Sequence, residues 1–287
     1  MTQVIATGFA MGCIYALVGL GFILIYNATH GLNFAHGELV MLSSFLFYEA
    51  ARHSMPLWAA GIVALIGMTA LGFVFQKTLF VPLRRRPFIA FIIATIGISI
   101  VLRNAVLLIW GPNPLKVGSF FKTDFVRVGD IALSPESVFI VVATAIVLFA
   151  QYYLFFHTDL GRRMRATAQN PEMAELLGVR LRRMTSLTFM ISTCLAGVAG
   201  VLVAPIFLLD PDMGGGLIQK AFIGVIIGGF GSIPGAVAGG LIVGVLEVLI
   251  AVFISSTFRD AIVFALLIAL LLTFPRGLLG GPVEDRV

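Results

Sequence analysis

Long apolar runs separated by short polar segments dominate this chain. A helix needs about 20 apolar residues to cross the hydrocarbon core of a bilayer. Runs of that length are present at 4–26, 57–81, 88–110, 135–157 and 184–205. Shorter or interrupted apolar runs are present at 37–51, 217–232, 235–254 and 260–275. The pattern predicts an all-α, polytopic integral membrane protein with about eight or nine membrane segments.

Composition supports the same class of protein. Hydrophobic residues make up 59% of the 287 residues and charged residues 11%, with a mean hydropathy of +1.05, whereas about a quarter of a soluble domain is charged. The polar stretches are too short to bury a core of their own, so we expect 1–287 to form a single transmembrane domain. The first apolar run has no basic residue before it and no small-residue cleavage site after it, so we interpret it as a retained helix.

Basic residues indicate the orientation. The 82–87 turn and the 158–183 stretch are separated by two predicted spans and therefore lie on the same side. They hold nine of the nineteen Lys and Arg residues, three in the first and six in the second. The positive-inside rule makes both cytoplasmic, which places the amino terminus outside and the carboxyl terminus in the cytoplasm. The basic residues behind the net charge of +5 cluster in short loops between spans, so this charge does not indicate nucleic-acid binding.

The one long polar, basic stretch, 159–183, carries the signals of a short amphipathic helix. Asn170 can cap it, Pro171 suits its first position, and Gly178 suits a left-handed stop. The arginines that bracket it are Arg162, Arg163, Arg165, Arg180, Arg182 and Arg183. We expect this stretch to be a cytoplasmic loop that another protein binds.

The faces of this expected helix differ in character. Met173, Leu176 and Leu177 are spaced to share one face. Glu172 and Glu175 lie near its amino end, where the helix dipole favours negative charge. A short helix with one apolar face outside the membrane predicts a docking contact with a separate protein that drives transport.

Two interrupted segments are candidates for a pathway, because irregular backbone at membrane depth is tolerated where protein buries it or where it lines a wet cavity. The first break spans 27–38, and an interfacial loop is an equally good interpretation for Asn27 and His30. Its candidate pathway residues are Asn33, His36, Gly37 and Glu38. The polar ones precede apolar residues directly, so their burial would be costly without a role.

The second break is the GGFGSIPG segment, 228–235. Its candidate pathway residues are Gly229, Gly231, Pro234 and Gly235. Glycines recur at four-residue spacing from Gly231 to Gly239, which is typical of close helix packing. Packing explains most of these glycines, and a hinge or pathway-wall role stays open for the dense 228–235 segment.

Two charged residues, Arg103 and Glu247, lie inside apolar runs and should be costly there unless they are paired or face water. They are possible partners for each other, and a structural ion pair is favoured over a substrate site. Neither a phosphate-binding GxxxxGK[ST] loop nor the metal and nucleophile motifs HExxH, clustered Cys/His and GxSxG is present. The sequence therefore predicts no catalytic residue, no metal and no cofactor in this chain.

Three segments in order carry a family resemblance: GLNFAHGELVML (31–42), the 162–200 stretch, and AFIGVIIGGFGSIPGAVAGGLIVGVLE (221–247). They resemble the membrane permease subunits of branched-chain amino acid ABC importers, most closely the H-type subunit, over essentially the whole chain. The 174–178 segment falls where these permeases carry a Glu-Ala-Ala…Gly signature in the ATPase-contacting loop. Leu176 departs from the small residue expected there.

The resemblance implies a bacterial inner-membrane importer. Such permeases pair with a second homologous permease and with two cytoplasmic ATPases, which hold ATP and Mg, and they receive substrate from an extracytoplasmic binding protein. This chain would form half of the pathway for branched-chain or related small amino acids or amides. The low intramembrane charge suits a neutral or zwitterionic solute.

Other classes of membrane protein make different demands. A secondary transporter driven by an ion gradient needs carboxylates in the membrane, and this chain offers only Glu247, with Glu38 near a boundary. It also leaves the capped helix unexplained. A facilitative channel and a membrane-embedded enzyme are further alternatives, and dependence of uptake on ATP hydrolysis by a partner chain separates the importer from the two transport alternatives.

Overall fold

The computed structural model describes residues 2–84, 86–121, 126–128, 131–274 and 277–279. Six helical stretches in this part are long and apolar enough to cross a membrane. They are α1 (Thr2–Thr29), α3 (Leu57–Phe75) with its continuation, α5 (Phe88–Trp110), α6 (Pro135–His157), α9 (Leu181–Val203) and α11 (Ile233–Phe253). The five full-length spans expected from the apolar runs are confirmed as helices. The 235–254 run, expected to be short, is a full-length helix.

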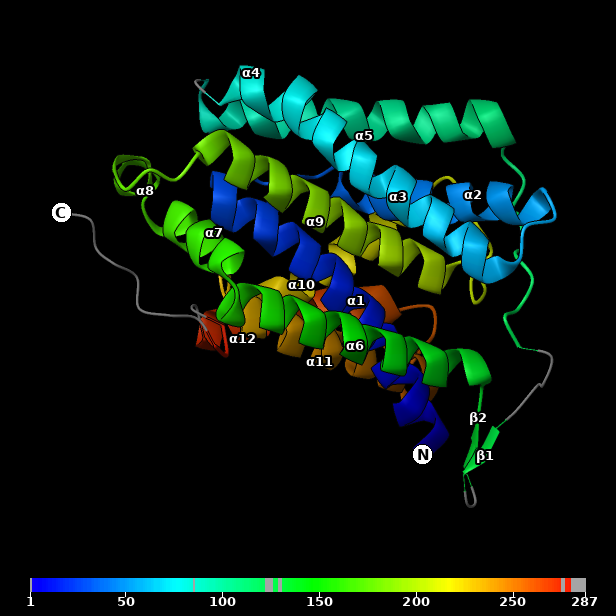
Figure 1. The fold of residues 1–287 in the computed structure, drawn as a ribbon. Coiled ribbons are helices and arrows are strands. Elements are labelled where there is room, and N and C mark those ends of the chain that lie inside the picture. Colours follow the sequence, from blue (N-terminus) through cyan, green and yellow to red (C-terminus); the bar gives the residue numbers. More distant parts are fainter. Residues whose placement is uncertain (1, 85, 122–125, 129–130, 275–276, 280–287) are drawn as a thin grey trace.

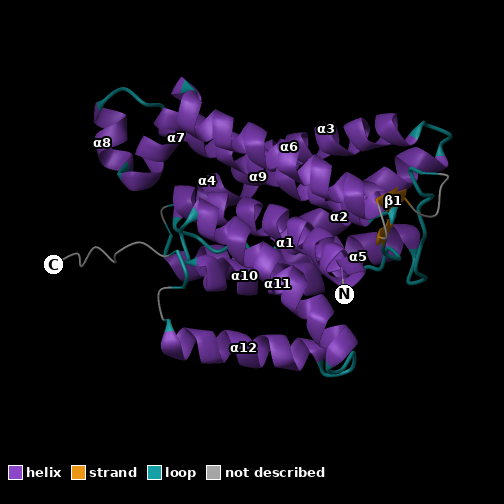
Figure 2. Cartoon of the chain, turned by 90° about the horizontal axis from the view of Figure 1, so that it is seen from below, coloured by secondary structure: helices purple, strands orange, loops and turns teal. Residues whose placement is uncertain are grey.

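Shorter helices complete the bundle. They are α2 (His36–Arg52), α10 (Met213–Gly228) and α12 (Arg259–Thr273). The continuation of α3 is a π-helical turn, Gln76–Phe80, followed by α4 (Val81–Leu83). The expected 217–232 segment therefore ends its helix at Gly228, before the second break. The helices run roughly alongside one another, and α12 stands at the margin of the bundle (Figures 1 and 2).

α1 forms the centre of the bundle. Its side chains from Ala10 to Ile25 are almost all buried because α6, α9, α10 and α11 surround it. Contact with α11 is the most extensive, since glycines on both helices let the backbones approach closely; a Cβ on Gly12 would lie 2.7 Å from the Cα of Leu241. By contrast, α3, α5 and α6 leave most of their apolar surface uncovered, as expected of helices that face lipid or a partner subunit.

The two ends of the bundle differ (Figure 1). One end carries α4, α7 (Asp159–Gln169) and α8 (Pro171–Leu176) and is called here the α8 end. The other carries the start of α1 and a hairpin of β1 (Val126–Val128) and β2 (Ile131–Leu133), and is called the hairpin end. The strands are antiparallel, with Val126 opposite Leu133. The all-α prediction is wrong at this hairpin, whose two strands, VRV and IAL, contain β-branched residues.

Candidate functional site

The expected helix in the 159–183 stretch is present as α8, with the predicted caps. The Asn170 side chain accepts a hydrogen bond from the Met173 amide at 3.0 Å, and Pro171 occupies the first turn. Gly178 stops the helix with a φ of +83°, a conformation that glycine adopts at little cost. Local capping chemistry therefore accounts for both ends of α8.

One face of α8 is apolar and uncovered. The side chains of Met173, Leu176 and Leu177 are exposed by 57%, 82% and 83%, while Ala174 is buried against the rest of the chain. α8 lies beyond the ends of the long helices (Figure 1), so lipid tails do not explain this surface. Contiguous exposed apolar side chains of this kind are typical of interaction surfaces.

The arginines do not simply bracket one helix, as the sequence analysis proposed. Arg162, Arg163 and Arg165 belong to a helix of their own, α7, which was missed. Arg162 forms an ion pair with Asp159, and Arg165 donates to the Phe155 carbonyl. The missed signal is the Thr158 cap, whose hydroxyl accepts from the Gly161 amide at 3.1 Å.

The first break lies inside the bundle, where 30–35 connects α1 to α2. Asn33, His36 and Glu38 are buried, so the interfacial-loop interpretation does not apply to them. Asn33 Oδ1 accepts from the Ala35 amide at 3.2 Å, and Glu38 Oε1 accepts from Ser99 Oγ at 3.3 Å.

Several polar atoms of this break have no hydrogen-bond partner among the described residues: Asn33 Nδ2, both ring nitrogens of His36, and Glu38 Oε2. Leaving such groups unpaired in an apolar interior costs free energy. Water or a passing polar solute would supply the missing partners, which makes the break a candidate wall of a pathway.

The start of α2 packs tightly on the start of α10. A Cβ on Gly37 would overlap the carbonyl oxygen of Gly214, and one on Gly214 would lie 2.5 Å from Glu38 Oε2. Gly37 is thus required for the close approach of two helix starts. This contact holds the Glu38 carboxyl beside the first turn of α10, where the helix dipole favours negative charge.

A cavity of about 310 Å³ lies between α5 and the segment that precedes α10. Its polar lining residues are Arg103, Asn104, Asp210 and Asp212. Arg103 forms an ion pair with Asp212. The suggested pairing of Arg103 with Glu247 is therefore wrong.

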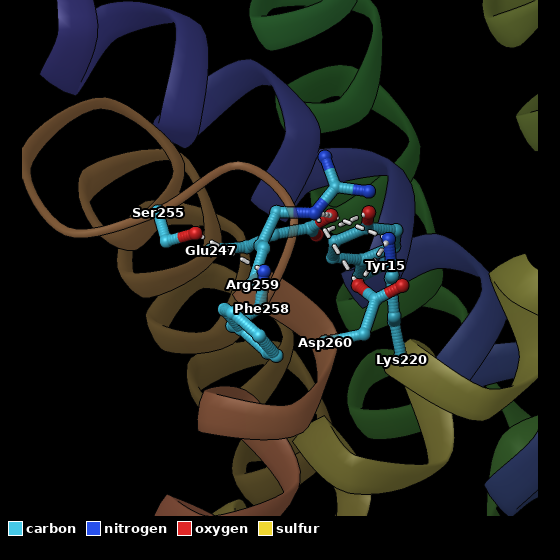
Figure 3. Close-up of polar contacts among 7 residues, drawn as sticks. All are labelled: Tyr15, Lys220, Glu247, Ser255, Phe258, Arg259 and Asp260. Carbon is cyan, nitrogen blue, oxygen red and sulfur yellow. Dashed lines mark hydrogen bonds and ion pairs between the residues drawn. The ribbon is translucent and has the colours of Figure 1, made fainter.

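Glu247, which is buried, instead belongs to a cluster with Tyr15, Lys220, Arg259 and Asp260 (Figure 3). The cluster joins α1, α10, α11 and α12. Sequence reasoning missed Lys220 and Arg259, because partners contributed by other helices leave no local pattern.

The second break is a tight turn between α10 and α11. Gly229 and Gly231 have φ values of +113° and +90°, and Asn27 Nδ2 donates to the Gly231 carbonyl at 3.0 Å. Gly235 packs on the backbone of Gly228, while Pro234 lies in the first turn of α11. Turn geometry and packing account for these glycines, and the pathway role of the segment stays a prediction.

Within the described residues, six apolar helices long enough to span a bilayer, a buried polar break and a short helix with an exposed apolar face indicate a multi-pass membrane protein of the transporter class. Residues 4–271 match the family described as the permease component of branched-chain amino acid transport systems. The chain belongs to this family.

Relatives are similar to this chain over most of their length. The high-affinity branched-chain amino acid transport system permease protein LivH of Escherichia coli (strain K12) is 34% identical, with 99% of this chain and 97% of LivH covered. BraD of Pseudomonas aeruginosa, with the same description, is 33% identical at the same coverage. The ribose import permease protein RbsC of Escherichia coli (strain K12) is 26% identical, covering 89% of this chain and 80% of RbsC. No solved structure matches this chain.

Proposed function

We propose that this chain is a membrane permease subunit of an ATP-driven importer and forms half of the translocation pathway for branched-chain or related small amino acids or amides. Its partners are a second homologous permease, two ATPases on the cytoplasmic side and an extracytoplasmic substrate-binding protein. ATP and Mg are bound by the ATPase subunits. The names of LivH and BraD support the substrate class, and family membership supports the permease role.

The observation that carries the proposal is the exposed apolar face of α8. Met173, Leu176 and Leu177 project from a capped helix outside the apolar bundle. An amphipathic helix that lays its apolar face into a groove is a common mode of protein recognition. When the ATPases close on ATP, a groove that holds α8 would pull on α7 and α9, to which α8 is joined, and tilt the spans between which solute passes.

The distribution of charge supports a cytoplasmic α8 end. Exposed arginines at this end are Arg84, Arg86, Arg162, Arg163, Arg180, Arg182 and Arg183. The positive-inside rule assigns such an end to the cytoplasm, and the α1 start then lies outside.

The pathway would pass the start of α2. Buried polar atoms of Asn33, His36 and Glu38 without partners in the described part of the chain can bind water or the polar groups of a zwitterion. An ion-gradient mechanism would have to use Glu38 or Glu247 for coupling, and Glu247 already contacts two cationic side chains.

Uptake into proteoliposomes tests the proposal. Vesicles containing this chain, its permease partner and the ATPases would enclose ATP and receive L-[³H]leucine with the binding protein from outside. We expect uptake that requires both ATP and the binding protein. Leu177→Asp should abolish uptake and its stimulation of ATP hydrolysis, because a buried carboxylate without a partner opposes docking of α8.

Leu177→Met is the matched control, since it keeps the size and apolar character of the side chain. It should support uptake, and both variants should be recovered in the membrane in equal amounts because position 177 is solvent-exposed. Unaltered uptake by Leu177→Asp would exclude α8 as the coupling contact. Uptake by the chain alone, without ATP, would exclude the importer and favour a secondary transporter or a channel.

A further inference from the structure

A second cavity, of about 220 Å³, lies between α1, the end of α9, α10, α11 and the start of α12. Most of its wall is apolar. These wall residues are Met11, Val203, Phe207, Leu208, Met213 and Leu217. Its polar end is formed by Tyr15, Lys220, Glu247 and Arg259. An apolar chamber with charge gathered at one end is suited to a small amphiphilic solute.

Glu247 is the fixed centre of the polar end. Its side chain is only 4% exposed, and Tyr15 donates its hydroxyl to Oε2 at 2.5 Å. Oε1 pairs with Lys220 and with Arg259 Nε, the latter at 3.2 Å. Both carboxylate oxygens are therefore engaged, so Glu247 positions the two cations and is not a site for a further ligand.

Arg259 retains unused donors. The contacts of Arg259 with both acids, Glu247 and Asp260, run through Nε, and no hydrogen bond from its two terminal nitrogens is found in the part of the chain that the structure describes. Figure 3 shows the guanidinium at the edge of the cluster. A guanidinium fork of this kind matches the two oxygens of a carboxylate.

The charged side chains at the polar end differ in their hydration. Glu247 is almost fully buried, but the other acid, Asp260, has 58% of its side chain exposed and is accordingly well hydrated. Lys220 is much less exposed, at 19%. Lys220 and Arg259, the latter with 38% of its side chain exposed, therefore share one desolvated carboxylate and one hydrated carboxylate. A ligand carboxylate that enters the cavity would add a further partner to the guanidinium.

The cavity lies toward the hairpin end. Glu247 precedes the last residue of α11, Phe253, by six positions, or about 9 Å along the helix, and Arg259 is the first residue of α12. In the proposed orientation this is the outer side, where a binding protein would deliver its cargo.

We propose that this cavity is an entry site that binds the carboxylate of an incoming aliphatic amino acid on the Arg259 guanidinium and its side chain on the apolar wall. The proposal rests on the proposed import function and adds a specific substrate site within the permease.

Two adjacent glycines provide a matched pair of variants. Gly216 lines the cavity, and a Cβ there would meet nothing within 4 Å. Gly215 has the same free space around its Cβ but is not part of the cavity lining. Gly216→Phe should place a bulky ring at the cavity wall, with a Cβ that meets no neighbour, while Gly215→Phe makes the same chemical change one position away on α10.

Equilibrium binding of L-[³H]leucine to the purified, assembled complex, without nucleotide and without binding protein, tests the site. We expect saturable binding that unlabelled leucine displaces and leucinol, which lacks the carboxylate, does not. Gly216→Phe should abolish binding and Gly215→Phe should leave it unchanged. Arg259→Lys should weaken binding by roughly tenfold or more, because it keeps the charge and loses the bidentate contact.

Uptake by the same preparations separates the two proposals. The entry site is overturned, and the import function left intact, if the wild-type complex takes up leucine with ATP but shows no saturable binding. The same conclusion follows if Gly216→Phe binds and takes up leucine as the wild type does. Equal displacement by leucinol overturns the role of the carboxylate. Absence of ATP-dependent leucine uptake by the wild-type complex refutes the import of leucine, and the entry site with it.

Discussion

Individual glycines allow α1 and α11 to come into backbone contact. A Cβ on Gly244 would overlap the backbone of Gly12, and one on Gly240 would lie 2.6 Å from the amide nitrogen of Ala16. Backbone atoms on both sides leave no flexible side chain to move aside. Close contacts between small residues are a main source of helix association in lipid, where the hydrophobic effect contributes little.

Gly244→Val should therefore destabilise the permease, by about 3 kcal/mol if it reaches the upper end of the usual cost of overpacking. Thermal unfolding in detergent, followed by the loss of the monodisperse peak in size-exclusion chromatography, measures the effect. Gly97→Val on α5 is the control, since a Cβ there meets nothing within 4 Å. Equal thermal stability of the two variants would contradict the packing role.

At the same scale, sequence reasoning identifies which residues need partners and fails to identify the partners. Arg103 and Glu247 stand out because a charge inside an apolar run is costly. Asp212 and Lys220, which pair with them, lie on other segments, and their proximity depends on how the helices are arranged. The same limit applies to the cavity beside Glu247, whose wall comes from separate helices.

Among the elements, α8 depends on its caps more than a long helix would. It has six residues, and isolated helices of that length are unstable in water because nucleation is costly. Asn170 holds its first turn through the Met173 amide, at 3.0 Å. Removing this cap costs about 1 kcal/mol.

Asn170→Ala should accordingly lower the affinity of the permease for its ATPase subunits by roughly fivefold, because part of the population loses the helical face that docks. Titration of detergent-solubilised permease with the ATPases measures this affinity. Asn170→Ser, which keeps a capping oxygen, should bind as the wild type does. Equal affinity of the alanine and serine variants would show that the cap does not limit docking.

Elements differ in how well the sequence predicts them. The long spans and α8 follow from local signals, namely an apolar run or a cap with a glycine stop. α7 was missed because its arginines were interpreted only as charges that flank α8. They belong to a helix that buries Gly161, Met164 and Thr167 on one side. The hairpin was missed because its strands have three residues each, too few for a periodic pattern to stand out beside the apolar spans.

For the whole molecule, the relative position of the ends is a property of the fold, while their assignment to cytoplasm or exterior comes from charge. The α8 end carries exposed arginines on three separate segments, and the start of α1 lies at the opposite end (Figure 1). The coupling role of α8 and the entry site near Arg259 both require that these ends face opposite compartments.

Labelling of single cysteines with a membrane-impermeant maleimide tests this arrangement. The free cysteines Cys13 and Cys194 would first be replaced by alanine. Exposed positions for new cysteines are Glu172 on α8, Asn113 after α5 and Thr257 before α12. Because positive charge retains the α8 end in the cytoplasm, Asn113→Cys and Thr257→Cys should react in spheroplasts and Glu172→Cys only in inverted vesicles. Reaction of Glu172→Cys in intact spheroplasts would reverse the orientation and remove α8 from the reach of cytoplasmic ATPases, whatever its shape.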